Sequence, residues 1–237
     1  MISIIIPSLD EESSLPPLLA AIGQQQAVHE VIVVDGGSLD RTLEVARNTG
    51  ARTLVTGSGR GAGLSIGAAA ARGDVFFFLH ADATLASGAL DRINQALATD
   101  QNVIGGNFRL IFDGDTAFSR WLTRFCALIR PLGFYYGDSG IFVRRGVYQA
   151  LGGFRPIPVM EDWDFVRRLE RIGRTCCIAD PPLVTSSRRF ENRHPLRIIY
   201  GLVRIHALYT LGVSPDRLLE IYRTQAPLQQ TQKRRIS

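Results

Sequence analysis

Short apolar runs alternate with segments of helical periodicity along residues 1–85 of the chain. Four of these runs are bounded by turn-forming residues and predict β-strands over 2–7, 30–35, 52–56 and 75–79. The first segment between them has an apolar helical face made by Leu15, Leu18, Leu19 and Ile22. Two further helices are expected after Ser38 and Ser87, whose hydroxyls would serve as N-caps. Strands separated by helices predict a doubly wound, mostly parallel α/β sheet with helices on both faces.

The second half of the chain has a different pattern. Apolar runs predict strands over 103–112 and 140–144, and amphipathic periodicity predicts helices over 118–129 and 161–172. Residues 195–223 are expected to form two helical stretches around Ser214-Pro215, as a C-terminal helical extension. This extension mixes apolar residues with arginines, so packing on the domain is its expected role and peripheral membrane contact is the alternative.

The composition is that of an ordinary globular protein. Of the 237 residues, 46% are hydrophobic and 21% are charged, which allows a sizeable core. The net charge is +5, and the basic excess is concentrated late in the chain. This excess fits an anionic ligand or an anionic membrane surface. With no nucleic-acid-binding motif in the sequence, it does not require nucleic acid.

Lysine and cysteine usage excludes several classes of chemistry. Lys233 is the only lysine, which argues against Schiff-base catalysis and against the lysine-dependent phosphate sites of P-loop proteins and kinases. The three cysteines form no CxxC motif, so neither a disulfide framework nor a zinc site is expected. The N-terminal run lacks the features of a signal peptide, and no window is long enough to span a membrane. A cytoplasmic protein with reduced thiols is therefore expected.

Polar and acidic residues follow each of the four strands predicted in the first half. These segments are Ser8 to Glu12, Asp35 to Asp40, Gly57 to Gly63, and His80-Ala81-Asp82. Taken one at a time, such acids often cap helices and such glycines often turn the chain. Together they converge on the carboxyl edge of one sheet, where ligands of open α/β proteins bind.

His80 and Asp82 are spaced i, i+2 after a strand, so both side chains are expected to point the same way. This arrangement suits a divalent metal that carries a phosphorylated ligand, whereas in the alternative Asp82 caps the next helix. The glycine-rich segment follows the third strand, which is too late in the chain for a dinucleotide fingerprint. That segment is expected to let the backbone approach a ligand, with Arg60 facing its anionic part.

Acidic motifs also stand out in the second half, namely Asp138 and the pair Glu161-Asp162 at a predicted helix start. Carboxylates there favour the positive end of the helix dipole, and the alternative is a general base. Adjacent helical residues do not face each other, so at most one of the pair is expected to act on a given substrate atom. The pair Arg188-Arg189 either holds a diphosphate or is a solvated charge run.

Together these motifs resemble those of the inverting family 2 glycosyltransferases, which have the GT-A fold. Pro7 to Glu12 is similar to the family's P-x-x-N-E segment, and Val31 to Asp40 to its VVDDGSTD segment. The remaining matches are Arg60-Gly61 with Ala68 to (K/R)-G-x-x-x-A, His80-Ala81-Asp82 to DxD, and Glu161-Asp162 to ED. Order and spacing agree over residues 1–190. The segments LHADA, GD-GIF-RR and MED narrow the resemblance to a bacterial subgroup of radical-SAM/selenodomain-associated transferases.

The resemblance implies a role for each matching residue. The nucleotide would be bound by Pro7, Leu9, Glu11, Asp35 and Arg60. The metal, Mn²⁺ or Mg²⁺, would be held by Asp82 with His80, and the diphosphate by Arg188 and Arg189. Asp138 and Trp163 would lie near the sugar or acceptor. Asp162, beside Glu161, would be the catalytic base.

Three residues depart from the family pattern. Asp10 replaces the usual Asn, Gly36 replaces the second Asp of VVDDGS, and His80 replaces the first Asp of DxD. The last change leaves one clear carboxylate for the metal. Mn²⁺ accepts an imidazole ligand more readily than Mg²⁺ does.

The implied reaction moves a sugar from a nucleoside diphosphate sugar, expected to be UDP-linked, to an acceptor hydroxyl with inversion. Residues 1–100 would bind the nucleotide and 101–190 the acceptor, with the helices of 191–226 packed on this domain and 227–237 as a flexible tail. A lipid-linked acceptor would place the protein at the inner face of the membrane, and the prediction also allows a homodimer.

Two other functions are alternatives to this one. A sugar nucleotidyltransferase would carry a glycine-rich loop directly after the first strand, where this chain has Ser8 to Glu12. The altered DxD motif suggests a nucleotide-sugar-binding protein without transfer activity. The intact Glu161-Asp162 pair argues against that alternative.

Overall fold

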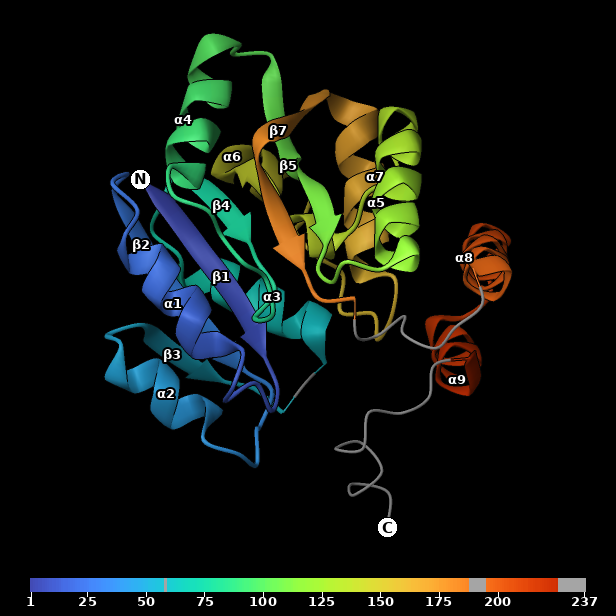
Figure 1. Ribbon diagram of the computed structural model, residues 1–237, viewed down its shortest axis with the longest axis horizontal. Helices are drawn as coiled ribbons and strands as arrows, with labels where there is room; N and C mark the ends of the chain where they lie inside the picture. Colours follow the sequence, from blue (N-terminus) through green and yellow to red (C-terminus); the bar gives the residue numbers. More distant parts are fainter. Residues whose placement is uncertain (58, 188–194, 226–237) are drawn as a thin grey trace.

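The computed structural model describes residues 1–57, 59–187 and 195–225. Within this part of the chain, one seven-stranded sheet has the order β3-β2-β1-β4-β6-β5-β7 (Figure 1). The strands are β1 (Ile2–Ser8), β2 (His29–Asp35), β3 (Arg52–Val55), β4 (Val75–Phe78), β5 (Val103–Phe112), β6 (Ile141–Arg144) and β7 (Arg174–Thr185). Only β6 runs against its neighbours, so the carboxyl ends of the other described strands share one edge of the sheet.

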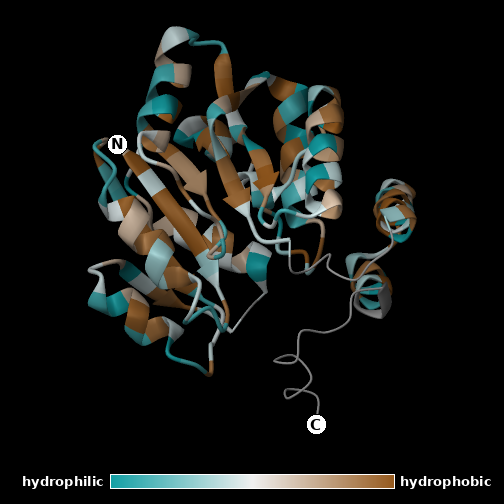
Figure 2. Cartoon of the chain, viewed as in Figure 1, coloured by the Kyte–Doolittle hydropathy of each residue, from teal (hydrophilic) through white to brown (hydrophobic). Residues whose placement is uncertain are grey.

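Helices cover both faces of the sheet and enclose two hydrophobic cores. One core contains residues of α1 (Leu15–Gly23), α2 (Thr42–Asn48) and α4 (Ala89–Thr99). The other contains residues of α3 (Arg60–Ala70), α6 (Arg145–Ala150) and α7 (Glu161–Ile172). Strand pleating divides β1 between the cores, because Ile4 and Ile6 face one side and Ile5 the other. The hydrophobic strands lie at the centre of the fold in Figure 2.

The remaining elements surround the second half of the sheet. They are α5 (Ala117–Ile129), which packs on β5, the 3₁₀ turns η1 (Arg130–Leu132) and η2 (Gly137–Ser139), α8 (Pro195–Thr210) and α9 (Pro215–Gln225). None of the described helices is both long and apolar enough to cross a membrane.

The predicted α/β class with helices on both faces of the sheet is confirmed by the sheet order and the two cores. The predicted apolar face of α1 is buried as expected.

Several predicted boundaries were wrong for identifiable reasons. The helix expected after Ser38 begins at Thr42, because the Ser38 hydroxyl donates to Asp35 instead of capping a helix. The helix expected after Ser87 is preceded by Gly88 in a left-handed conformation, with φ 75°. Strand β7 was not predicted, since Asp180-Pro181-Pro182 interrupts its pattern and many of its residues are only half-buried.

The glycine-rich segment after β3 forms helix α3 from Arg60 onward. Its glycines allow close packing. A Cβ added to Gly67 would lie 2.5 Å from Ile5 Cγ2, and one added to Gly61 would lie 2.9 Å from the carbonyl oxygen of Arg155. Since α3 packs this closely, the position of Arg60 at its start is fixed by the sheet and by the segment before α7.

Helix α8 docks on the start of α7. Trp163 and Met160 are buried with Ile205 of α8 and Leu218 of α9. The Trp163 and His206 rings meet edge to face at 4.6 Å between centroids. His206 Nδ1 donates to the Leu202 carbonyl (2.6 Å) and its Nε2 accepts from the Tyr136 hydroxyl (3.0 Å). Burial lowers the pKa of His206, which favours the neutral ring that this pattern requires.

Candidate active site

Two loops at the carboxyl edge of the sheet are joined by hydrogen bonds, and these loops with the strand ends before them carry all the predicted nucleotide-binding residues except Arg60. Gly36 N donates to Ser8 O (2.8 Å), and Leu39 N donates to Asp10 Oδ1 (2.8 Å). Glu11 is half-buried, and its backbone N donates to Thr42 Oγ1 (2.7 Å). Pro7 is half-buried at the end of β1, whereas the Leu9 side chain is exposed. These bonds join the loops after β1 and β2 into one structural unit, which we call the ledge.

Asp35 is buried at the base of this ledge, with 2% of the residue exposed. Its Oδ2 accepts from the backbone N of Gly37 and of Ser38, both at 3.0 Å, and its Oδ1 accepts from the Ser38 hydroxyl. A carboxylate has about four acceptor positions, and these bonds occupy three of them. Asp35 thus shapes the turn after β2.

Arg60 joins the two halves of the chain. Its Nε donates to Glu161 Oε1, and its Nη2 lies 3.8 Å from Asp162 Oδ2. The Glu161 side chain is 1% exposed, whereas that of Arg60 is 39% exposed. Burial would lower the pKa of Arg60, but the carboxylates of Glu161 and Asp162 raise it above its ordinary value. Arg60 therefore remains a cation beside both members of the acidic pair.

The acidic pair at the start of α7 has two distinct environments. Glu161 is buried against Arg60, while Asp162 is 13% exposed and is the member that solvent or a ligand can reach. Asp162 Oδ2 accepts from Gly137 N (3.0 Å), and its Oδ1 accepts from Trp163 N (2.7 Å). These bonds fix the orientation of the carboxylate. The separation agrees with the expectation that only one of two adjacent helical residues acts on a given atom.

The turn η2 brings His80 and Asp138 to the same cluster. His80 Nδ1 lies 3.0 Å from Asp138 Oδ1, and both side chains are largely buried. A Cβ added to Gly137 would lie 2.7 Å from His80 Nε2 and 3.4 Å from Asp162 Oδ2. Only a glycine leaves room here, because the His80 ring and the Asp162 carboxylate both border the backbone of residue 137. The structure therefore groups Arg60, His80, Asp138, Glu161 and Asp162, which we call the acidic cluster.

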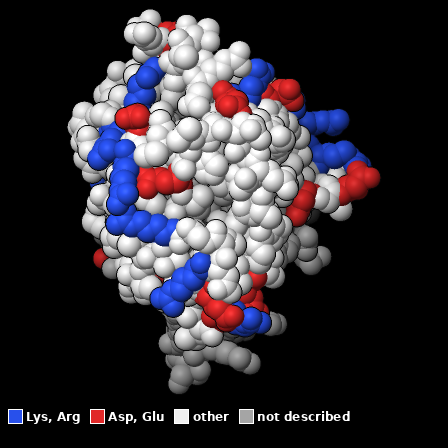
Figure 3. Space-filling view, turned by 90° about the vertical axis from the view of Figure 1, so that its left-hand side faces the viewer, with Lys and Arg blue, Asp and Glu red and all other residues white. Residues whose placement is uncertain are grey.

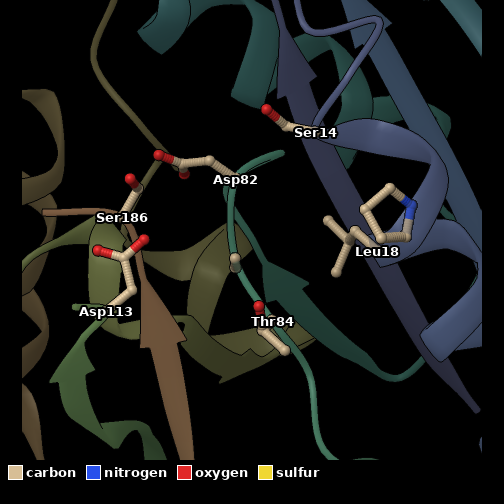
Figure 4. Close-up of a pocket in the computed structure, with 8 residues that line it drawn as sticks. Ser14, Leu18, Asp82, Thr84, Asp113 and Ser186 are labelled. Carbon is tan, nitrogen blue, oxygen red and sulfur yellow. The ribbon is translucent and has the colours of Figure 1, made fainter. Parts of the chain in front are cut away.

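Asp82 faces a different neighbourhood. It lines a pocket with Asp113, Ser186 and Thr84 from the ends of β4, β5 and β7, and with Ser14 and Leu18 at the start of α1. In Figure 4, the side chains of Asp82, Ser186 and Asp113 lie on one side of this pocket, with Ser14 and Leu18 on the other. Since β4 ends at Phe78 and the chain turns, with Ala83 N donating to His80 O (3.2 Å), the alternation expected of a strand does not extend to Asp82.

Asp113 and Ser186 were missed in the sequence. Asp113 follows β5 directly, so the rule that placed functional residues after the first four strands would have found it if applied to the fifth. Its Oδ1 accepts from Ser187 N at 2.5 Å, which ties the end of β5 to the end of β7. Ser186 carried no signal, because β7 itself was not predicted.

The chemistry of the pocket residues can be tested against a divalent cation. No group of three or more His, Cys, Asp or Glu side chains suited to a metal occurs among the described residues. Mg²⁺ and similar ions are, however, commonly held by one or two carboxylates together with substrate phosphates, not by a cage of protein ligands. The carboxylate of Asp82, among other oxygen-bearing side chains, fits an ion of that kind.

Other predicted site residues are placed as follows. Trp163 is 4% exposed and packs against Phe134, with ring centroids 4.8 Å apart. It is buried together with Ile205 of α8, so it belongs to the contact with α8 and not to the acidic cluster. Arg188 and Arg189 lie outside the described residues. The three cysteines are free thiols, and burial raises the pKa of Cys126 to about 12, which makes its thiolate scarce at neutral pH.

Several known proteins are similar to this chain in sequence. A 4,4'-diaponeurosporenoate glycosyltransferase of Staphylococcus haemolyticus is 38% identical over 42% of this chain, a match that spans 29% of the relative's own length. A PGL/p-HBAD biosynthesis glycosyltransferase of Mycobacterium tuberculosis is 30% identical over 78% of this chain and 72% of its own. An undecaprenyl-phosphate 4-deoxy-4-formamido-L-arabinose transferase of Pseudomonas paraeruginosa is 29% identical over 64% of this chain and 49% of its own.

Solved structures share the fold at low sequence identity. A mannosyltransferase from Pyrobaculum calidifontis in complex with GDP-Man and Mn²⁺ matches with a TM-score of 0.67 at 19% identity, covering 94% of this chain and 69% of that one. Residues 1–349 of S. aureus TarS in complex with UDP-GlcNAc match with a TM-score of 0.67 at 17% identity, covering 98% and 69%. Residues 3–151 match the sequence profile of the family described as glycosyl transferase family 2. Because that match covers more than half of the chain, the chain belongs to glycosyl transferase family 2.

Proposed function

We propose that this chain transfers a sugar from a nucleoside diphosphate sugar to an acceptor hydroxyl, with inversion at the anomeric carbon. The observation that carries the proposal is the acidic cluster. In it, Arg60 from the first half of the chain meets Glu161 and Asp162 from the second half, at the edge of the sheet where ligands of α/β folds bind. Membership of family 2 supports the donor class, since similar folds have been solved with GDP-Man and with UDP-GlcNAc.

Asp162 is the general base in this proposal. Its carboxylate takes the proton of the acceptor hydroxyl while that oxygen forms a bond to the anomeric carbon, and the bond from the anomeric carbon to the diphosphate oxygen breaks. The electron pair of the broken bond leaves with the nucleoside diphosphate. The contacts with Gly137 N and Trp163 N orient Asp162, and Arg60 supplies positive charge beside it.

The ledge after β1 and β2 is the proposed nucleotide site. Asp35 would accept a hydrogen bond from the base, and Glu11 would lie near the ribose, with Pro7 and the exposed Leu9 beside them. Asp82 would hold Mn²⁺ or Mg²⁺ in the proposal, whereas His80, which was expected to share the ion, contacts Asp138 in the acidic cluster instead. Such an ion supplies charge stabilisation to the diphosphate when bound.

The donor class can be tested by thermal unfolding with a panel of nucleotide sugars. UDP- or GDP-linked sugars are expected to raise the Tm, because a ligand at 100 times its Kd adds about 2.7 kcal/mol to the free energy of unfolding. The Asp82→Asn variant should lose the part of this shift that depends on Mn²⁺ and keep the rest. An unchanged Tm with every donor would contradict the proposal, and binding without transfer or slow hydrolysis would favour a nucleotide-sugar-binding protein.

The Gly137→Ala variant tests whether the cluster geometry matters. The new methyl group would lie 2.7 Å from His80 Nε2, so either the ring or the turn must move, and we expect transfer to fall at least tenfold while the fold persists. Gly146→Ala is a matched control, because a Cβ there meets no atom within 4 Å. Steady-state kinetics and Tm measured on both variants would show whether transfer is lost while the fold persists. Equal activity of the two variants would remove His80 and the turn from the mechanism.

The acceptor and the location of the protein remain proposals. The Pseudomonas paraeruginosa relative is named for undecaprenyl phosphate, which supports a lipid-linked acceptor for this chain and hence a cytoplasmic protein at the inner face of the membrane. We also propose that residues 1–100 bind the nucleotide and residues 101–190 bind the acceptor. Membership of the radical-SAM/selenodomain-associated subgroup stays a prediction, and so does the formation of a homodimer.

A further inference from the structure

Helix α8 is apolar on two opposite sides. Ile198 and Ile205 are buried on the side that docks on the domain, with exposed fractions of 7% and 5%. Leu196, Tyr200 and Val203 follow each other at spacings of four and three, so they share the opposite side of the helix, and they are 67%, 64% and 62% exposed. We call these three residues the outer face. A helix that is hydrophobic all round normally has both sides covered, so the outer face requires a partner.

Charge selects the kind of partner. Within the described helix α8, the only residues with a formal charge are Arg197 and Arg204, both exposed, and there is no Asp or Glu. Because a helix has 3.6 residues per turn, Arg197 and Arg204 lie about two turns apart, on the same side of the outer face. The opposite, β3 side of the molecule differs, because basic and acidic side chains are interspersed there (Figure 3). Two copies meeting through α8 would oppose arginines without acidic counterparts on that helix, which disfavours self-association.

We propose that the outer face of α8 lies on an anionic lipid surface. The apolar side chains would enter the boundary between headgroups and acyl chains, with Tyr200 at headgroup level, while Arg197 and Arg204 pair with lipid phosphates. The helix has 16 residues and does not span a bilayer, so the contact is peripheral. This inference concerns attachment and does not depend on the donor chemistry proposed above.

The docked side of the same helix leads directly to the candidate active site. His206 of α8 contacts Trp163, the neighbour of Asp162, and its Nε2 accepts from Tyr136, the neighbour of Gly137. A bilayer under the outer face would therefore lie about one helix diameter, or roughly 10 Å, from the residues that orient the base. If the proposed function holds, an acceptor carried by a lipid would reach the cluster from this side.

Co-sedimentation of the full chain with phosphatidylcholine vesicles, with and without phosphatidylglycerol, tests the proposal. We expect binding to the anionic vesicles that weakens as salt rises. The double variant Tyr200→Ser/Val203→Ser should bind at least about tenfold more weakly, because two apolar side chains lose their burial. Replacing Arg197 and Arg204 by glutamine should cost about fivefold per arginine. Val28→Ser is the matched control, since Val28 is 72% exposed at the opposite edge of the sheet and should leave binding unchanged.

Two results would overturn the proposal. One is failure of the unmodified chain to bind anionic vesicles, and the other is equal binding by the outer-face variant. A concentration-dependent dimer that this variant abolishes would instead assign the face to a second copy. Tm and nucleotide binding measured on the same variants show whether they remain folded, and nucleotide binding reports on the proposed function separately from vesicle binding.

Discussion

The Asp162→Asn variant is expected to lose sugar transfer by a factor on the order of 10²–10⁴ while nucleotide binding survives, because an amide cannot take the acceptor proton. The substitution preserves shape, and the amide oxygen still accepts one of the two backbone bonds from Gly137 N and Trp163 N. Turnover measured at saturating donor, together with the Kd of the nucleotide, separates loss of chemistry from loss of binding.

Asp91→Asn is the matched control for this experiment. Asp91 also lies in the first turn of a helix, α4, and is exposed away from the cluster. Its loss should leave both turnover and nucleotide affinity unchanged. If Asp162→Asn retained turnover close to that of Asp91→Asn, the assignment of Asp162 as the base would be wrong.

Arg60→Met is expected to lower the free energy of unfolding by about 1–3 kcal/mol, because it leaves the buried carboxylate of Glu161 without its cation. The Arg60 side chain is partly exposed, so we use this range in place of the larger loss typical of fully buried pairs. The double variant Arg60→Met/Glu161→Leu should recover part of the loss, since it removes the orphaned charge as well. Urea unfolding of the four proteins in this cycle gives the coupling between the two side chains.

A surface ion pair provides the comparison. Arg41 and Glu44 lie 3.0 Å apart with side chains 72% and 54% exposed, so solvent screens the attraction between them. Arg41→Met should therefore change stability much less than Arg60→Met. Equal effects of the two substitutions would mean that the Arg60–Glu161 pair does not organise the cluster.

Sequence periodicity was a sufficient guide wherever one face of an element is buried along its whole length. The α1 face and the strands β1 and β4 follow this rule, and the carboxyl edge of the sheet followed from the predicted strands. The rule failed for β7, where Asp180-Pro181-Pro182 and exposed residues mask a strand at the edge of the sheet. Such a strand is recognised only through its pairing with β5, which is a tertiary contact.

In the candidate site, residue types could likewise be predicted from the sequence, whereas side-chain orientations could not. The residue types at the strand ends and at the start of α7 were readable, because chemistry depends on side-chain identity. Their orientations were not, since His80 and Asp82 diverge where the chain turns after β4, and Trp163 is covered by a helix more than thirty residues later. Asp138 was expected near the sugar, and its contact with His80 could not be inferred from spacing.

The tight seating of α3 affects how variants of this protein should be interpreted. Gly61 and Gly67 touch no proposed ligand, yet a side chain at either position would collide with Arg155 or Ile5 and displace the helix that carries Arg60. A mutational survey that scores only activity would therefore rank these two glycines with the catalytic residues. Stability measured alongside activity would separate them from Asp162 but not from Arg60, because the same displacement breaks the Arg60–Glu161 ion pair. In such a survey, the boundary between scaffold and active site runs through this helix.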